Sequence, residues 1–401
     1  MKTWILLSSL FLINCGGSST PVTSTKLIKL SHDRVAEQAS LLQGLGEMLE
    51  YYITLKIDGQ NFDLVADTGS SNLIVAGLSA SEASKEPIDP FLLSYGGGTS
   101  INVQNHLLSV SLENNDEKST YRVGVPQCVK QCSDTFPRIL GLAYRGVEQP
   151  ADDRQPTFFT QMLSVEKPAL SNEFSMLLCG FKDDGSHNGK TNILFGGIEP
   201  GVTLTDSDYT PITENSWYVV NATEIKIEGK SMGKFNSPAP TAENPCATLN
   251  KRTGSNNCTI VDSGTTINQV PKTMHEAIRD HLAPKVNLQT NNPFWDPTVL
   301  VEVDGKMVIP TLPCDTIRKA GLPTVDVHIG ELIVKIPSKS YFKSKGGGGC
   351  MFGFGPTNVD SPNFKILGQV AMENQYVHFD RKFNNKKGRI GFKQSLGLCG
   401  N

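Results

Sequence analysis

Two short stretches of this sequence place an aspartate directly after an apolar run and before a glycine. The first reads "VADTGSSN" around Asp67, and the second reads "VDSGTT" around Asp262. In each stretch the glycine permits a tight turn, and the small hydroxyl residues can hydrogen-bond the carboxylate. A carboxylate held at such a turn is suited to acid–base chemistry. Asp67 and Asp262 are therefore the candidate catalytic residues.

Both stretches belong to a longer internal repeat. The phrase "RILGLAY" at 138–144 follows the first aspartate, and "KILGQVA" at 365–371 follows the second. In each half a strand would deliver the aspartate to its turn, and the apolar pair before the later glycine would pack beneath that turn. If the halves pack about an approximate twofold axis, the two turns meet there. Either motif alone would be an ordinary turn, but the matched pair predicts two carboxylates facing one another.

Two carboxylates in contact share a proton, because ionising both brings like charges together. The ionised partner can take a proton from water, while the protonated partner donates a hydrogen bond to the carbonyl under attack. Such a pair would hydrolyse a peptide bond with no covalent intermediate, and the shared proton would belong to both residues. The residues expected to support it are Thr68 and Ser263, with hydroxyls that can bond across the axis, Ser70 and Thr265, with hydroxyls that can orient the outer carboxylate oxygens, and the turn glycines Gly69 and Gly264.

The elements that must position these residues read mostly as β-strands. After Tyr51 come short alternating segments such as "YYITLKI", "NFDLVA" and "QYVHFD", separated by Gly, Pro, Asn and Asp. The clearest helical pattern is "PKTMHEAIRDHL" at 271–282, with its apolar residues on one face. A chain of 401 residues is long enough for two lobes with separate cores. The sequence therefore predicts a mostly β fold with few helices.

The composition excludes some partners and cofactors. The chain has a formal net charge of −3, with 38% hydrophobic and 19% charged residues, which is typical of a globular protein. It contains no basic tract that would indicate nucleic acid binding. The spacing of "CVKQC" at 128–132 imitates a metal pair, but no nearby His or Cys completes four ligands, so a local disulfide is favoured. We expect neither a metal nor a cofactor.

Residues 1–19 are expected to be an export signal, because Lys2 precedes the apolar run "WILLSSLFLI", which is too short to span a bilayer. Two interpretations of Cys15 remain open. It resembles the lipidated first residue of a bacterial lipoprotein, with Leu12 suitably placed and Asn14 a poor match, or it is discarded with an ordinary secretory signal. The protein would then be extracytoplasmic, either secreted or held at the cell surface by a lipid anchor.

The remaining cysteines agree with export. Eight of them follow Cys15, and an even number in an exported chain favours disulfides. The polar stretch 20–47 before the β-rich part would be a short prosegment or tether, or it would supply a first edge strand.

With its "ILG" partners, the doubled D-[ST]-G motif resembles the pepsin family of aspartic endopeptidases, from about residue 50 to about residue 399. Several phrases are especially similar to the β-secretase subgroup, among them "RILGLAY", "NEFSMLLCG" and "FDRKFNNKKGRIGF". The resemblance implies a bilobal β fold with an N-terminal lobe at 48–212, a C-terminal lobe at 213–401 and an active-site cleft between them. It also implies a polypeptide substrate bound in an extended conformation, and we expect a monomer.

The resemblance further implies a hairpin flap over the cleft, with Tyr95 reaching towards the substrate and Gly96 and Gly97 permitting motion. Ile74 stands where many pepsin-like enzymes have a tryptophan that bonds the flap tyrosine. The disulfides implied by the subgroup are Cys179–Cys399 and Cys314–Cys350, which leaves Cys128–Cys132 and Cys246–Cys258 as local pairs.

One alternative belongs to a different functional class. A pepsin-like chain can keep its fold after losing catalysis and act as a binding protein of the cell surface or secretome. Such relatives typically damage one D-[ST]-G motif or crowd the cleft. Both aspartates and all supporting hydroxyls are intact here, so the sequence favours the enzyme.

Overall fold

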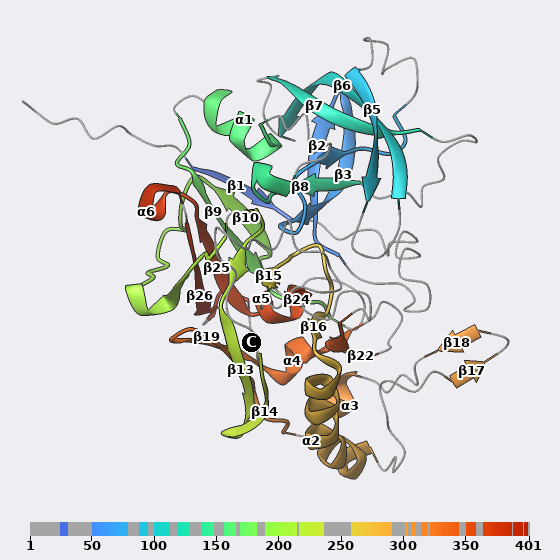
Figure 1. Ribbon diagram of the computed structural model, residues 1–401, viewed down its shortest axis with the longest axis vertical. Helices are drawn as coiled ribbons and strands as arrows, with labels where there is room; N and C mark the ends of the chain where they lie inside the picture. Colours follow the sequence, from blue (N-terminus) through green and yellow to red (C-terminus); the bar gives the residue numbers. More distant parts are fainter. Residues whose placement is uncertain are drawn as a thin grey trace, which may run out of the picture.

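The structure is a computed structural model, and strands predominate over helices in the part of the chain that it describes (Figure 1), which confirms the predicted, mostly β fold class. The described residues are 25–30, 50–78, 88–94, 100–112, 119–127, 138–147, 156–165, 169–182, 189–214, 216–235, 258–290, 301–303, 306–308, 314–318, 321–344, 350–357, 364–386, 388–395 and 397–399.

A seven-stranded sheet forms the N-terminal part, in the order β2-β3-β8-β4-β7-β6-β5. Alternation of apolar and polar residues places Ile53, Leu55 and Ile57 of β2 in the core, all of them fully buried. Helix α1 (Phe158–Val165) packs on this sheet, where the Phe158 ring lies 4.8 Å from that of Tyr121. The strands are β2 (Tyr52–Ile57), β3 (Gln60–Asp67), β4 (Leu73–Ile74), β5 (Ile88–Ser94), β6 (Ser100–Leu112), β7 (Ser119–Pro126) and β8 (Ile139–Gly141).

The C-terminal part contains a five-stranded sheet, a four-stranded sheet and two strand pairs. The five-stranded sheet is β12 (Val219–Val220), β15 (Cys258–Val261), β24 (Phe364–Leu367), β16 (Asn268–Val270) and β23 (Phe354–Pro356). The four-stranded sheet is β14 (Lys230–Lys234), β13 (Ala222–Ile227), β19 (Val325–Ile329) and β20 (Leu332–Ile336). The pairs are β17 (Val301–Val303) with β18 (Lys306–Val308), and β21 (Phe342–Ser344) with β22 (Cys350–Phe352).

Three helices accompany these sheets: α2 (Lys272–Thr290), α3 (Cys314–Arg318) and α4 (Ser338–Tyr341). Helix α2 begins directly after Pro271, as the sequence predicts, but it continues past residue 282 and through Pro284. A proline costs a helix one backbone hydrogen bond, and here Val286 beyond it is fully buried in the core. Tertiary packing therefore carries the helix beyond its predicted end.

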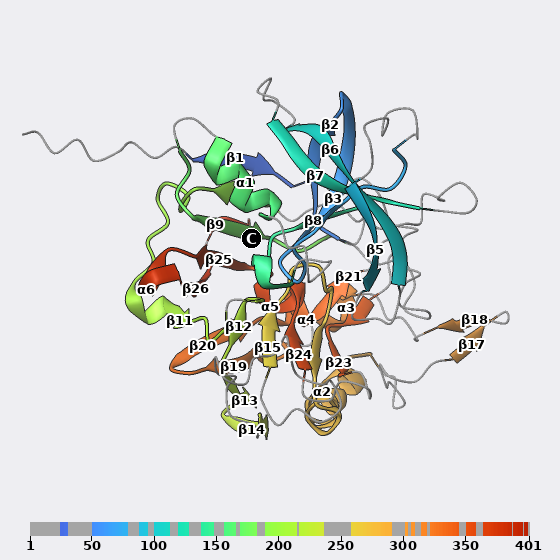
Figure 2. The same cartoon turned by 45° about the horizontal axis from the view of Figure 1, so that its top comes forward.

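A six-stranded sheet joins the two halves, in the order β1-β10-β9-β25-β26-β11 (Figures 1 and 2). Strand β9 pairs antiparallel with β25, and the rings of Phe174 and Phe379 stack at 4.6 Å across this pair. Short helices α5 (Gln369–Met372) and α6 (Phe383–Lys386) flank β25 in the chain. The strands are β1 (Lys26–Lys29), β9 (Glu173–Leu178), β10 (Asn192–Phe195), β11 (Tyr209–Pro211), β25 (Gln375–Asp380) and β26 (Arg389–Gln394).

Within the stretch 20–47, the structure describes residues 25–30, and these supply the edge strand of that sheet. Strand β1 pairs antiparallel with β10, and the Leu30 side chain after it is fully buried. This segment is therefore part of the folded molecule.

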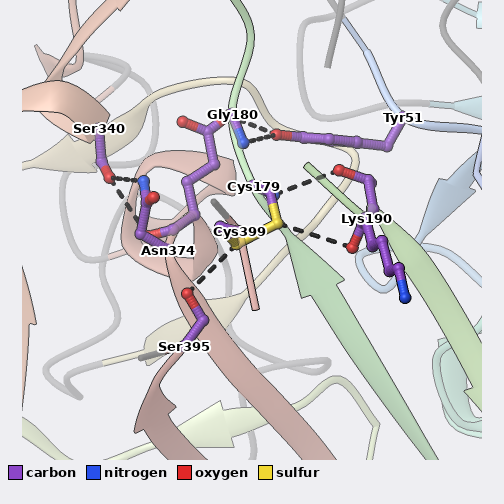
Figure 3. The surroundings of a disulfide bond; sticks show 10 residues. Tyr51, Cys179, Gly180, Lys190, Ser340, Asn374, Ser395 and Cys399 are labelled. Carbon is purple, nitrogen blue, oxygen red and sulfur yellow. Dashed lines mark hydrogen bonds between the residues drawn. A yellow bond between two sulfur atoms is a disulfide. The ribbon is translucent and has the colours of Figure 1, made fainter. Parts of the chain in front are cut away.

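Two disulfides lie within the described residues. Cys179 at the end of β9 is joined to Cys399 near the C-terminus, with their Cα atoms 5.1 Å apart (Figure 3), and Cys314 is joined to Cys350, with Cα atoms 4.7 Å apart. Cys258 is also disulfide-bonded. Its predicted partner Cys246, and the predicted pair Cys128–Cys132, lie outside the described residues, as does Cys15.

Candidate active site

Each half carries its aspartate at the end of one strand of a parallel pair, and the two pairs are equivalent. Strand β3 ends at Asp67 and runs parallel to β8, with Asp67 opposite Gly141. Strand β15 ends one residue before Asp262 and runs parallel to β24, with Val261 opposite Leu367. Both partner strands contain the "ILG" phrase of the repeat. The strand beneath each aspartate turn is thus the one that the sequence predicts.

The glycine of each "ILG" phrase lies directly against the neighbouring turn. A Cβ atom on Gly141 would come within 2.5 Å of the Ser71 carbonyl carbon. A Cβ atom on Gly368 would come within 2.4 Å of the Thr265 carbonyl oxygen. No larger residue fits either position without moving backbone, so these glycines set how closely the second strand supports the turn.

The two carboxylates meet between the lobes. A Cβ atom on Gly69 would lie 2.5 Å from Asp262 Cγ, and one on Gly264 would lie 2.5 Å from Asp67 Cγ, so each turn glycine faces the opposite aspartate. Each carboxylate therefore lies against the turn that carries the other. Both residues are buried, with 8% and 7% of their surface exposed.

Local donors orient each carboxylate in the same way. The Gly69 amide donates to Asp67 Oδ1 at 2.7 Å, and the Ser70 hydroxyl donates to Oδ2. In the second half the Gly264 amide donates to Asp262 Oδ1 at 2.9 Å, and the Thr265 hydroxyl donates to Oδ2 at 2.7 Å. Each carboxylate is therefore held in place through both of its oxygens.

Hydroxyls from the two turns also cross the interface. The Thr68 amide donates to Ser263 Oγ at 3.0 Å, and the Ser263 amide donates to Thr68 Oγ1 at 2.9 Å. Each hydroxyl then donates to a strand carbonyl of the opposite half: Thr68 to Val261 O at 2.9 Å, and Ser263 to Ala66 O at 2.5 Å. Because both hydroxyls are fully buried, these bonds lock the relative position of the turns.

The electrostatics favour a protonated pair. Burial, followed by the charge of neighbouring Asp262, raises the pKa of Asp67 well above its ordinary value, against the opposing hydrogen bonds from Ser70 and Gly69. A proton is therefore retained between the carboxylates at a pH where an isolated aspartate would be ionised.

Trp217 is a contact of the site that the sequence does not indicate. Its indole Nε1 donates to Gly69 O at 2.9 Å, and its ring packs edge-on against Phe364 at 5.4 Å. Trp217 belongs to the C-terminal half, so this bond holds the turn of Asp67 from the opposite lobe. No repeat or motif marks the residue.

The predicted flap residues Tyr95, Gly96 and Gly97 lie outside the described residues, between paired strands β5 and β6. Ile74 is buried in an apolar cluster beneath this hairpin. The other members of that cluster are Phe91, Leu93, Ile101, Val103 and Ile139.

Known proteins share this organisation. The family model described as eukaryotic aspartyl protease matches residues 50–394. The chain is 26% identical to pepsin A of Gallus gallus over 372 residues, which cover 84% of this chain and 83% of that protein. It is 27% identical to cathepsin D of Dictyostelium discoideum over 372 residues, covering 87% and 84%. It is 25% identical to cathepsin D of Clupea harengus over 375 residues, covering 86% and 81%. A match over most of the chain, on a bilobal β fold with paired aspartates, means that the protein belongs to the eukaryotic aspartyl protease family, the aspartic endopeptidases that act on polypeptides.

Proposed function

We propose that Asp67 and Asp262 are the catalytic pair of this aspartic endopeptidase. The observation that carries the proposal is the matched geometry of the two turns, in which each aspartate faces the glycine of the other turn. Both carboxylates have the same set of local donors, and they are buried together. Thr68, Gly69, Ser70, Ser263, Gly264 and Thr265 support the pair.

In the proposed reaction the pair holds one proton. A water molecule gives a proton to the ionised carboxylate as its oxygen attacks the scissile carbonyl carbon, while the protonated carboxyl donates its proton to the carbonyl oxygen. The resulting tetrahedral intermediate collapses as the carboxyl that took the proton from water gives it to the amide nitrogen, one hydroxyl of the intermediate gives its proton to the other carboxylate, and the C–N bond breaks. The released carboxyl and amine account for the added water, and the pair again holds one proton.

Digestion of a diverse peptide mixture at several pH values tests this proposal, with and without a transition-state-analogue inhibitor of aspartic proteases. We expect inhibitor-sensitive cleavage by the wild type and a loss of roughly a thousandfold or more in Asp67→Asn and Asp262→Asn, because either change removes one half of the acid–base pair. Both variants should remain folded by circular dichroism. Substantial cleavage by either variant would exclude the paired mechanism, and a folded wild type that binds peptides without cleaving them would favour the binding-protein alternative.

We also propose that the lobes at 48–212 and 213–401 enclose a cleft for an extended peptide, and that Tyr95, Gly96 and Gly97 contact this peptide from the tip of the β5–β6 hairpin. Ile74 packs against apolar side chains of β5 and β6, which supports a flap that is positioned by apolar contacts and not by a tryptophan hydrogen bond. Strand β5 ends at Ser94, β6 begins at Ser100 and the two strands pair, so these residues fall in the sequence between two paired strands.

For the location, we propose an extracytoplasmic monomer that is secreted or anchored through Cys15. The disulfides support an oxidising compartment. No helix among the described residues is both long and apolar enough to cross a membrane. Expression of wild type and Cys15→Ser in a bacterial host that processes lipoproteins decides between the two: only lipidation predicts that the change moves the protein from the membrane to the soluble fraction.

A further inference from the structure

A hydrogen-bonded chain of buried side chains runs beneath the second catalytic turn, and Glu50 stands at its end next to that turn. Glu50 lies two residues before the start of β2, in the first half of the sequence. Its Oε1 accepts a hydrogen bond from Thr266 Oγ1 at 2.7 Å, and its Oε2 accepts one from Gln369 Nε2 at 2.5 Å. Glu50 therefore reaches across the lobe interface to the residues that surround Asp262.

Gln369 connects Glu50 to the backbone of the same turn. This fully buried side chain also donates from Nε2 to Ser263 O at 2.9 Å, and the backbone N–H of Gln369 donates to Thr265 O at 2.8 Å. The turn that orients Asp262 is thus held by hydrogen bonds from Gln369 to two of its carbonyl oxygens and by the hydrogen bond from Thr266 to Glu50. The removal of either side chain would leave buried polar groups without their partners.

A buried lysine fixes which way the Gln369 amide points. Lys343 Nζ donates to Gln369 Oε1, which turns the amide nitrogen towards Glu50 and Ser263. The same ammonium forms an ion pair with Glu373 Oε1 at 2.9 Å, and both side chains are 1% exposed. Tyr51 Oη donates to Glu373 at 2.8 Å and accepts from the Gly180 amide at 3.0 Å, beside the Cys179–Cys399 disulfide (Figure 3).

We propose that Glu50 is a positioning residue of the second catalytic turn: with Gln369 it fixes the turn that carries Asp262, and its ionised carboxylate helps the aspartate pair to keep its shared proton as the pH rises. The inference rests on the proposed catalytic pair and adds a residue that acts through it. Glu50 does not need to touch the substrate.

The charge balance around Glu50 supports this role. Burial raises the pKa of Glu50 to about 7; the charge of Lys343 and the hydrogen bonds from Thr266 and Gln369 oppose the rise, and the charge of Asp262 adds to it. The ionisable groups that face it are Lys343 from β21, Asp262 after β15 and the adjacent Tyr51, with Glu373 engaged by Lys343. Near neutral pH Glu50 becomes an anion close to the catalytic pair, and an added negative charge makes the last proton of the pair harder to remove.

The pH dependence of kcat and kcat/KM for Glu50→Gln tests the proposal. Glutamine has nearly the same shape as glutamate, and the Thr266 hydroxyl can accept a hydrogen bond from the new side-chain amide, so the turn that carries Asp262 should stay in place. Without the charge, the alkaline limb of the profile should move to lower pH by roughly 0.5 to 1 unit, while kcat at acid pH stays within about twofold of wild type. Glu276→Gln, an exchange of the same kind on the outer surface of α2, should superimpose on wild type.

A second variant tests the positioning itself. Glu50→Ala removes both acceptors, so kcat should fall roughly tenfold at every pH with a smaller change in KM. If this variant fails to fold, the Glu50→Gln profile decides alone. An alkaline limb that stays in place or moves to higher pH in Glu50→Gln would overturn the inference. Asp262→Asn, measured alongside, distinguishes failure of the proposed function from failure of this inference. If Asp262→Asn is active, the proposed catalytic pair is wrong. If it is inactive and the pH profile of Glu50→Gln matches that of the wild type, only the role of Glu50 is wrong.

Discussion

At the scale of single residues, the site is built from short polar contacts that leave little freedom to either carboxylate. Asp67 and Asp262 each receive one backbone amide and one hydroxyl, and these donors come from the same turn as the acid that they orient. Such local contacts follow from the tripeptide spacing, which explains why the sequence predicts them. The contacts between lobes are of another kind, and Trp217 is the clearest example.

Trp217→Phe should lower kcat by roughly threefold to tenfold while leaving KM within about twofold, because the loss of one hydrogen bond to the turn of Asp67 disturbs the orientation of the proposed catalytic carboxylate more than substrate binding. Phenylalanine preserves the edge-on packing with Phe364 and removes only the indole donor to Gly69 O. Steady-state kinetics on one peptide substrate measure the effect, and the thermal midpoint of unfolding checks that the fold is intact. If kcat is unchanged, the Trp217 bond has no part in positioning Asp67.

At the scale of elements, the repeat predicts strands better than it predicts their partners. The parallel pairs β3–β8 and β15–β24 follow from two copies of one pattern. The pairing of β9 with β25 does not, because it joins segments about two hundred residues apart that share no motif. The contact between Glu50 and Gln369 is equally unpredictable from the sequence. Their hydrogen bond spans 319 residues, and an isolated glutamate before a strand belongs to no motif that would indicate its partner.

The two disulfides that close the C-terminal part offer a test at the same scale. Cys179–Cys399 spans 220 residues, and Cys314–Cys350 spans 36. The chain-entropy model gives an upper figure of about 5.4 kcal/mol for the longer loop and about 3.8 kcal/mol for the shorter one. All four cysteines are at most 5% exposed, so replacement by alanine leaves cavities of similar size.

We therefore expect the double variant Cys179→Ala/Cys399→Ala to be destabilised by about 1.6 kcal/mol more than Cys314→Ala/Cys350→Ala. Guanidinium unfolding of both variants, followed by tryptophan fluorescence at one pH, gives the comparison. The reverse order would show that local packing at Cys314 outweighs the loop that the longer disulfide closes.

At the scale of the whole molecule, carboxyl groups with opposite pKa shifts bound the pH range of stability. Burial raises the pKa of Glu50 to about 7 and that of Asp67 well above its ordinary value. Burial would also raise the pKa of Glu173 in β9, but hydrogen bonds from His378 and Lys382 outweigh it and lower that pKa to about 2. The ordinary value for a glutamate is 4.5, so the two glutamates lie on opposite sides of it.

These shifts act on stability in opposite directions. A lowered folded-state pKa, as in Glu173, contributes stability above pH 4.5 that is lost as the pH falls towards about 2. A raised folded-state pKa, as in Glu50, contributes stability below pH 4.5 that is lost as the pH rises through about 7. Each glutamate accounts for roughly 3.4 kcal/mol at most, from the free energy of a pKa change. Stability should thus be greatest in mildly acidic solution.

Guanidinium unfolding of the wild type at pH 3, 4.5 and 7.5 should place the highest midpoint at pH 4.5. Glu50→Gln should lose less stability than wild type between pH 4.5 and 7.5, because it has no charge to bury, and Glu173→Gln should lose less between pH 4.5 and 3, because its hydrogen bonds no longer depend on ionisation. Glu276→Gln on α2 is the matched control and should follow the wild type throughout. A wild-type midpoint that rises steadily from pH 4.5 to 7.5 would contradict the raised pKa of Glu50, and an unchanged acid limb in Glu173→Gln would remove the β9 network as the cause of acid sensitivity. The two halves of the pH profile thus report on two separate places where the lobes are joined, one beneath the catalytic turn and one in the six-stranded sheet.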